Sequence, residues 1–196
     1  MICRICRHTN VEGGRFCSRC GHHLAEGLPD PSEGPLSRVD VIGGERRQLS
    51  VMFCDVVGST APSARLDLEE LHEVMQAYRA ACGEVIARFD GHIAQYLGDG
   101  ILVYFGYPRA HEDDAPRAVS AALRILEAIR ELNDHITPRH GIRLAVRVGI
   151  HSGLVVVGGM GAIHGQLALG ATPNLAAHLQ APAEPGAVLV SGTTHR

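Results

Sequence analysis

Two aspartates in the sequence stand where apolar runs break, and both have the chemistry to bind a divalent cation. Asp55 ends the run Leu-Ser-Val-Met-Phe-Cys-Asp at 49–55, and Asp99 lies in Leu-Gly-Asp-Gly at 97–100. A carboxylate at the end of a buried strand is costly unless it is paired or bound to a metal. Hard divalent cations prefer oxygen ligands and share them with substrate phosphates. If the two strands are neighbours in a sheet, the aspartates converge, and the sequence predicts a cation site there.

The elements around the aspartates follow from the spacing of apolar residues, which recur every three or four positions in helices and alternate or cluster in strands. We predict, in chain order, strand 49–55, helix 67–89, strands 92–97 and 101–105, helix 112–132, strands 143–151 and 154–157 joined by a turn, helix 173–181 and strand 187–190. Gly-Asp-Gly at 98–100 is strong hairpin chemistry, because turn positions need positive φ. The order β-α-β-β-α-β indicates a ferredoxin-like α+β domain with helices on one face of an antiparallel sheet.

Cysteines near the N-terminus form the pattern C-x2-C-x10-C-x2-C, which is typical of a zinc site. They are Cys3, Cys6, Cys17 and Cys20. Two C-x2-C knuckles supply four thiolates to one tetrahedral Zn²⁺, so we predict one structural zinc ion and a small zinc ribbon over 1–24. Two disulfides in a secreted domain are the alternative, although no export signal is visible. His22 and His23 follow directly and could also ligate a metal.

The composition of the chain predicts its domain organisation and excludes some classes of function. The chain has 196 residues, 45% of them hydrophobic, and a net charge of −3; its 18 basic residues are all arginine. The Pro- and Gly-containing stretch 25–44 has the composition of a linker to a main domain over 45–196. The charge balance argues against nucleic acid as a partner. Because no run approaches the ~18 apolar residues of a membrane span and no signal peptide is visible, we expect a cytoplasmic protein without a membrane segment.

Four motifs over about 46–196 resemble those of the class III adenylate and guanylate cyclases. They are Phe-Cys-Asp-Val-Val-Gly-Ser-Thr at 53–60, Leu-Gly-Asp-Gly at 97–100, Val-Gly-Ile-His-Ser-Gly at 148–153 and Gly-Ala-Thr-Pro-Asn-Leu-Ala-Ala at 170–177. The resemblance implies conversion of ATP to cyclic AMP and pyrophosphate in intracellular signalling, with GTP as the other substrate of the family. It implies that Asp55, Asp99 and the carbonyl of Val56 hold two Mg²⁺ or Mn²⁺ ions, a pair suited to in-line displacement at phosphorus. The phosphates would be bound by the backbone N–H groups of Val57, Gly58, Ser59 and Thr60.

The resemblance further implies a head-to-tail dimer in which an Asn and an Arg of one protomer complete the metal site of the other. Asn174 matches the Asn, while His178 stands at the Arg position. An imidazole does not reproduce the permanent charge and planar fork of a guanidinium. At the positions that contact the base, Gln95 replaces the usual Lys and Leu167 the usual Asp or Thr. Gln95 can hydrogen-bond a purine edge through its amide, whereas Leu167 can only pack.

These departures leave two further hypotheses open. In the first, the chain is a degenerate cyclase that binds metal and nucleotide as a regulatory module, or forms a heterodimer with a complete cyclase protomer. In the second, the zinc ribbon, which carries four Arg and one Glu over 1–24, binds nucleic acid while the main domain dimerises it. Family domains continue past the strand at 187–190, so we also expect the domain to be truncated at Arg196.

Overall fold

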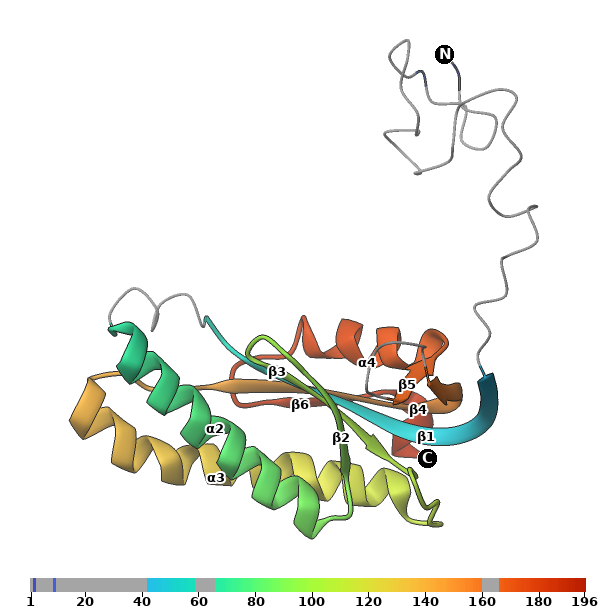
Figure 1. Cartoon of the computed structure of the whole chain (residues 1–196), viewed down its shortest axis with the longest axis horizontal. Helices are drawn as coiled ribbons and strands as arrows, with labels where there is room; N and C mark the ends of the chain where they lie inside the picture. Colours follow the sequence, from blue (N-terminus) through green and yellow to red (C-terminus); the bar gives the residue numbers. More distant parts are fainter. Residues whose placement is uncertain (1, 3–8, 10–41, 59–65, 160–165) are drawn as a thin grey trace. The chain divides into compact units, whose positions relative to one another are not determined.

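A computed structural model of the chain describes residues 2, 9, 42–58, 66–159 and 166–196 (Figure 1). The chain divides into two compact units, Met1–Asp40 and Val41–Arg196. In the first unit an isolated antiparallel bridge joins Ile2 and Thr9. The four cysteines of the expected zinc ribbon lie outside the described residues, so the zinc site stays a prediction.

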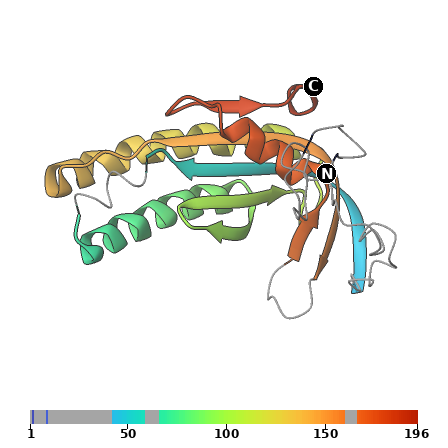
Figure 2. The same ribbon diagram turned by 90° about the horizontal axis from the view of Figure 1, so that it is seen from above.

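The second unit is built on a six-stranded sheet in which β1 is central. In order across the sheet the strands are β2 (His92–Leu97), β3 (Gly100–Phe105), β1 (Ile42–Val56), β4 (Val146–Gly159) and β5 (Gln166–Leu169). All these neighbours are antiparallel, but β6 (Val188–Val190) pairs in parallel with β4, and Figure 2 shows it on the outer side of that strand. The sheet is therefore mixed, and the expectation of a purely antiparallel sheet is wrong. The physical reason is the helical connection before β6, which returns the chain in the same direction as β4.

β4 is one long strand, although the sequence predicted two strands joined by a turn. Ser152 and Gly153 continue the strand and pair with β1, where the Ser152 Oγ lies 2.7 Å from the Ser50 Oγ in a buried contact. A Cβ built on Gly153 would lie 2.7 Å from the Thr172 Oγ1. The glycine therefore marks a close approach of another element, which is a common reason for glycine inside a strand.

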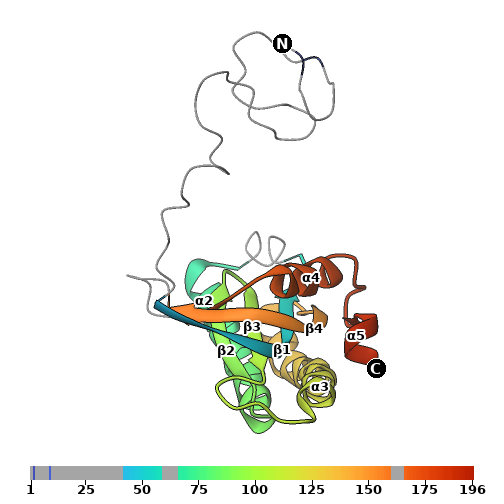
Figure 3. The same ribbon diagram turned by 90° about the vertical axis from the view of Figure 1, so that its right-hand side faces the viewer.

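Helices cover both faces of the sheet (Figure 3). α2 (Leu68–Arg88) and α3 (Asp114–His140) pack on one face, and α4 (Ala171–Gln180) packs on the other. The prediction that all helices share one face is wrong for α4. Alternate residues of β1 explain the arrangement, because Met52 and Cys54 face α2 and α3 while Leu49 and Val51 join the cluster that contains Ala176 of α4. A last short helix, α5 (Gly192–His195), ends the chain.

The ends of the helices follow from local polar contacts. α2 begins at a capping box, in which Asp67 accepts a hydrogen bond from the Glu70 N–H and Glu70 accepts one from the Asp67 N–H. α3 continues well past the predicted end at 132. Asn133 breaks the apolar pattern there, but it is buried and its amide exchanges two hydrogen bonds of 2.8 Å with the backbone of Leu144. A polar residue that is satisfied in this way does not interrupt the helix.

Candidate active site

Asp55 and Asp99 lie near each other because β1 and β3 are neighbours. Asp55 is the penultimate residue of β1, and Asp99 lies in the turn between β2 and β3. The pairing of Cys54 with Ile101 aligns the two segments, and the Asp55 Oδ1 lies 3.5 Å from where a Cβ on Gly100 would stand. Burial raises the pKa of Asp55, and the negative charge of Asp99 raises it further. The two carboxylates thus repel each other, which is the condition that a bound cation relieves.

The second oxygen of Asp55 is held by two donors from other elements. The Gln180 Nε2 donates a hydrogen bond of 3.2 Å to the Asp55 Oδ2, and the Arg147 Nη2 lies 3.7 Å from the same oxygen. Both contacts favour the charged form and lower the pKa of Asp55, although less than burial raises it. Oδ2 is therefore fixed by protein groups, while Oδ1 faces the turn that carries Asp99.

Arg147 is a site residue that the sequence analysis missed. It lies directly opposite Asp55 in the pairing of β4 with β1, and its Nη1 donates a hydrogen bond of 3.0 Å to the Ala181 carbonyl. Its Nε is buried and has no hydrogen-bond partner within the described part of the chain. A guanidinium held this way beside Asp55 has the chemistry to bind phosphate oxygens. The only signal in the sequence is a charged residue inside an apolar strand.

Gln180 was also missed, and the backbone of α4 explains why it reaches Asp55. The last turn of α4 rests on Gly149 of β4, where an added Cβ would lie 2.3 Å from the Ala176 carbonyl oxygen and 2.4 Å from the Gln180 N. Only a residue without a side chain permits this approach. Glycine at 149 therefore fixes the depth of α4, and with it the place of the Gln180 amide.

We expect Gly149→Ala to destabilise the domain by about 3 kcal/mol, because the new methyl group meets backbone atoms that cannot rotate away. The free energy of unfolding from urea titration measures the effect. Gly83→Ala is the matched control, since a Cβ there meets only the Ile93 Cδ1 at 3.9 Å. Within α2 that change should stabilise the domain by ~0.5–1 kcal/mol. Equal effects of the two substitutions would contradict the close contact at Gly149.

The residues expected to bind phosphate are only partly described. The Val57 N–H donates a hydrogen bond of 2.8 Å to the carbonyl of Ala145, the residue that precedes β4, and phosphate binding at Val57 stays a prediction. Gly58 is exposed and has a φ of +64°. Ser59 and Thr60 lie outside the described residues.

Asn174 and His178 lie on the exposed side of α4, four residues apart. The opposite side of the helix contacts the sheet through Thr172, Ala176 and Gln180, which are all buried. No described contact joins Asn174 or His178 to Asp55 of the same chain. Both side chains are instead placed where a second molecule could meet them.

The two residues expected to contact the base lie on strands at opposite edges of the sheet. Gln95 is exposed on β2, where it pairs with Leu102 of β3. Leu167 lies in β5, a strand that the sequence analysis did not predict, and its backbone pairs with Gly158. The side chain of Leu167 is outside what the structure describes.

The donor set fits a hard divalent cation. Within the described ranges, no group of three or more His, Cys, Asp or Glu residues could hold a metal. A cation would therefore take its protein ligands from Asp55, Asp99 and backbone carbonyls, all of them oxygen. Mg²⁺ is commonly held in this way, by one or two carboxylates with water and substrate phosphates completing the shell.

Comparison with known proteins identifies the family. The model of the adenylate and guanylate cyclase catalytic domain matches residues 43–196. An adenylate cyclase of Streptomyces griseus is 34% identical over 146 residues, which are 74% of this chain and 31% of that protein. The crystal structure of the guanylyl cyclase Cya2 superposes with a TM-score of 0.75 at 35% identity over 78% of each chain. That of the adenylyl cyclase CyaB from P. aeruginosa gives 0.75 at 28% identity, over 78% of this chain and 81% of that one. The chain belongs to the adenylate and guanylate cyclase catalytic domain family.

The chain spans less than a third of the curated relatives that it matches. It covers 15% of an uncharacterized protein of Rhizobium meliloti and 25% of the adenylate cyclase of Anabaena cylindrica. Among the helices of the described ranges, none has the length and apolar character needed to cross a membrane.

Proposed function

We propose that the chain acts in the cytoplasm as a nucleotide cyclase that converts ATP to cyclic AMP and pyrophosphate. The observation that carries the proposal is the pair of mutually repelling carboxylates, Asp55 and Asp99, with the guanidinium of Arg147 beside Asp55. An oxygen-only cation site next to a fixed cation suits a substrate that carries several phosphates. Membership of the cyclase family supports the same reaction.

We assign the residues of the site separate roles toward the metal ions, the phosphates and the reacting atoms. Asp55, Asp99 and the Val56 carbonyl would hold two divalent cations, whose chemistry would be activation of the ribose 3′-hydroxyl and neutralisation of charge on the triphosphate. Gln180 keeps Asp55 oriented through its hydrogen bond to Oδ2. Arg147 contacts the phosphates and balances charge on the departing pyrophosphate.

A second protomer completes the proposed site. Asn174 and His178 are exposed on α4 and point away from their own sheet, so in a head-to-tail dimer they approach the carboxylates of the partner. Gln95 offers an amide to the purine edge. Adenine is proposed over guanine because the relatives from Streptomyces griseus and Anabaena cylindrica are named adenylate cyclases.

Incubation of the purified chain with ATP and Mn²⁺, followed by chromatographic quantification of cyclic AMP, tests the proposal. A parallel reaction with GTP determines the base preference. Product from either nucleotide supports a cyclase, and the ratio of the two rates assigns the substrate. A folded protein that forms neither cyclic nucleotide would exclude turnover by this chain alone.

A regulatory or heterodimeric role is the second candidate, and His178 is the observation that favours it. The chain retains the carboxylate half of the site but has an imidazole where the family has a guanidinium. Mixing it with a cyclase that retains its own Asn and Arg, but has its metal aspartates replaced by alanine, separates the two roles. Activity that arises only in the mixture would show that this chain supplies the carboxylates to a heterodimer.

Gln180→Ala is expected to weaken Mn²⁺ binding by about tenfold, because partners that orient a ligating carboxylate contribute about this much to metal affinity. Electron paramagnetic resonance of free Mn²⁺ gives the affinity without requiring turnover. Gln76→Ala is the control, since Gln76 is exposed on α2 and, within the described residues, its amide hydrogen-bonds to His72. Unchanged Mn²⁺ affinity in Gln180→Ala would remove the positioning role from this amide.

We also propose one structural Zn²⁺ bound by the four N-terminal cysteines, on the strength of their spacing alone. Zinc content of the purified protein, measured by mass spectrometry of the element, should be one per chain. It should fall when Cys17 and Cys20 are replaced by serine. Metal-free protein with four reactive thiols would contradict the zinc site.

A further inference from the structure

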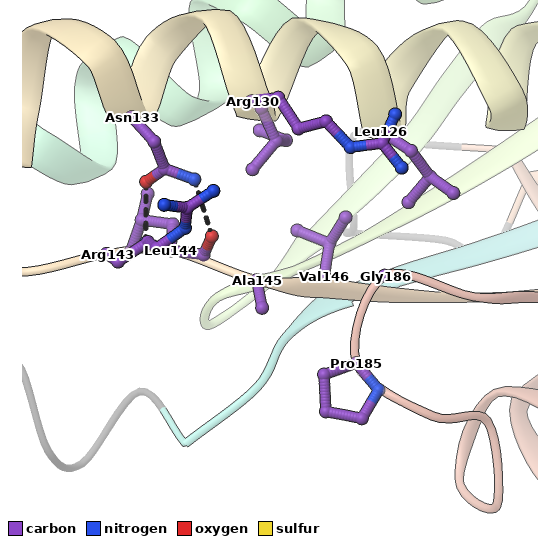
Figure 4. A pocket seen from close by; sticks show the side chains of 10 residues that line it. Leu126, Arg130, Asn133, Arg143, Leu144, Ala145, Val146, Pro185 and Gly186 are labelled. Atoms are coloured by element: carbon purple, nitrogen blue, oxygen red, sulfur yellow. Dashed lines mark hydrogen bonds between the residues drawn. The ribbon is translucent and has the colours of Figure 1, made fainter.

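A groove of about 270 Å³ lies between α3 and the residues that lead into β4 (Figure 4). α3 forms one wall through Leu126, Ile129 and Arg130, and the turn at Pro185 and Gly186 forms another. The Gly186 N–H donates a hydrogen bond of 2.8 Å to the Val146 carbonyl, which ties this turn to the strand. The groove is thus bounded by α3, by the start of β4 and by the turn at Pro185 and Gly186.

The floor of the groove is apolar, and its one amide side chain is already hydrogen-bonded. Leu126, Ile129 and Val146 are among the buried core residues. Asn133 also lines the groove, but its amide is engaged with the backbone of Leu144 at both ends, as Figure 4 shows. An occupant therefore meets hydrocarbon at the floor, without competing for hydrogen bonds already made.

Two arginines stand at the rim without acidic partners. Arg130 and Arg143 are exposed, and neither has an ion pair or hydrogen bond with any residue that the structure describes. Among the described residues, no acidic side chain lines the groove. Figure 4 shows the two guanidinium-bearing side chains separated along it. With respect to the described part of the chain, all ten donors of the two guanidinium groups are thus available to an anion.

Two other grooves of similar size do not have this excess of positive charge. The groove of about 240 Å³ that contains Arg88 and Arg124 also contains Glu84 and Glu131, and Arg124 lies 2.9 Å from Glu131. In the groove of about 260 Å³ between α2 and α3, Arg139 lies 3.4 Å from Glu73. Both of these grooves are balanced by their own carboxylates.

We propose that the groove between α3 and β4 binds a small amphipathic anion, a carboxylate or phosphate monoester that carries a short apolar chain. The anionic head lies between Arg130 and Arg143, and the chain lies against Leu126, Ile129 and Val146. The volume of the groove is just below the ~300–1,000 Å³ of common ligand cavities, so the proposed ligand is small. The proposal does not depend on cyclase activity.

The bound anion would contact the reverse side of the strand that supports the carboxylates. Val146 pairs with Val56, and the next residue along β4, Arg147, pairs with Asp55. Alternate residues of a strand point to opposite faces, so Val146 faces the groove while Arg147 faces Asp55. A ligand in the groove would therefore contact Val146, which is adjacent in sequence to Arg147 of the candidate active site.

Titration of ¹⁵N-labelled protein with octanoate, octyl phosphate, 1-octanol and acetate tests the proposal by NMR. Octanoate or octyl phosphate should shift the amides of Leu144, Ala145, Val146 and Gly186, and the tighter of the two identifies the head group. Octanol lacks the charge and acetate lacks the chain, so both should bind at least ten times more weakly. The double variant Arg130→Gln, Arg143→Gln should weaken octanoate or octyl phosphate binding roughly tenfold or more, since each charge-assisted hydrogen bond is strong.

The control is the double variant Arg88→Gln, Arg124→Gln, which removes two charges from the balanced groove and should leave binding unchanged. All the replaced arginines are at the surface, so thermal melts should confirm that both double variants are folded. Equal binding of octanol and octanoate would overturn the assignment of an anion. Amide shifts centred elsewhere, or unaltered binding after loss of Arg130 and Arg143, would overturn the site itself.

Discussion

Asp55→Asn is expected to abolish cyclic nucleotide formation while it stabilises the metal-free domain. Asparagine has nearly the same shape but lacks the charge that binds a divalent cation, so the rate should fall by about 10³-fold or more, as expected when a group that stabilises a phosphoryl-transfer transition state is lost. The reaction with ATP and Mn²⁺ measures this loss. Asp134→Asn, on the exposed side of α3, is the matched control and should retain activity.

The stability gain has a defined pH dependence. Burial and the charge of Asp99 raise the pKa of Asp55 in the folded state, so ionised Asp55 destabilises the fold relative to a neutral residue. The gain in Asp55→Asn should be full at neutral pH and should vanish as the pH falls below the ordinary Asp pKa of about 3.9, where wild-type Asp55 is protonated in both states. Saturating Mn²⁺ should stabilise the wild type and not the variant. A variant that is less stable than the wild type at neutral pH without metal would contradict the repulsion between Asp55 and Asp99.

His178→Arg is expected to raise turnover by about 10³-fold, because an arginine that reaches the transferring phosphates contributes 10³–10⁵ in comparable reactions. The position is exposed on the same side of α4 as Asn174, so with respect to the described residues the longer side chain extends into solvent. The same cyclic AMP reaction measures the gain, and the rate should rise with the square of protein concentration below the dimer dissociation constant.

Leu175→Arg is the matched control for this gain. Leu175 is 43% exposed on α4, so the substitution adds an equal charge next to Asn174 without occupying the family's arginine position. Leu175→Arg should leave turnover near that of the wild type. A wild type as active as His178→Arg would show that the imidazole already suffices, and an equal gain from both variants would point to a general effect of charge.

The core of the site could be predicted because its signals are local. The hairpin at 92–105 follows from alternating apolar residues around Gly-Asp-Gly, and the structure confirms both strands. Asp55 stands at the end of an apolar run that can only be a buried strand. Once β1 and β3 are taken as neighbours, the approach of the two aspartates follows without further information.

Arg147 and Gln180 could not be predicted as site residues. The place of Arg147 depends on the register between β4 and β1, and that of Gln180 depends on how closely α4 packs on the sheet. The pairing of Asp55 with Arg147 joins residues that are far apart in sequence, and a shift of β4 by one residue would turn Arg147 to the other face. Gln180 reaches Asp55 only because α4 lies directly on Gly149. The same limit explains why α4 was predicted on the wrong face of the sheet. This short helix contacts the sheet through Thr172, Ala176 and Gln180, so its sequence has no apolar stripe that would indicate a particular face.

In the proposed head-to-tail dimer, α4 would link the reaction centre of its own protomer to that of its neighbour. One end of this ten-residue helix contacts Asp55 of the same protomer through Gln180, and its exposed side carries Asn174 and His178. If a bound cation shifted Asp55, the hydrogen bond to Gln180 would transmit that shift to the helix that carries Asn174 and His178. In a head-to-tail dimer the two sites would therefore not saturate independently, and a Hill coefficient different from one for Mn²⁺ would be the visible sign of their communication.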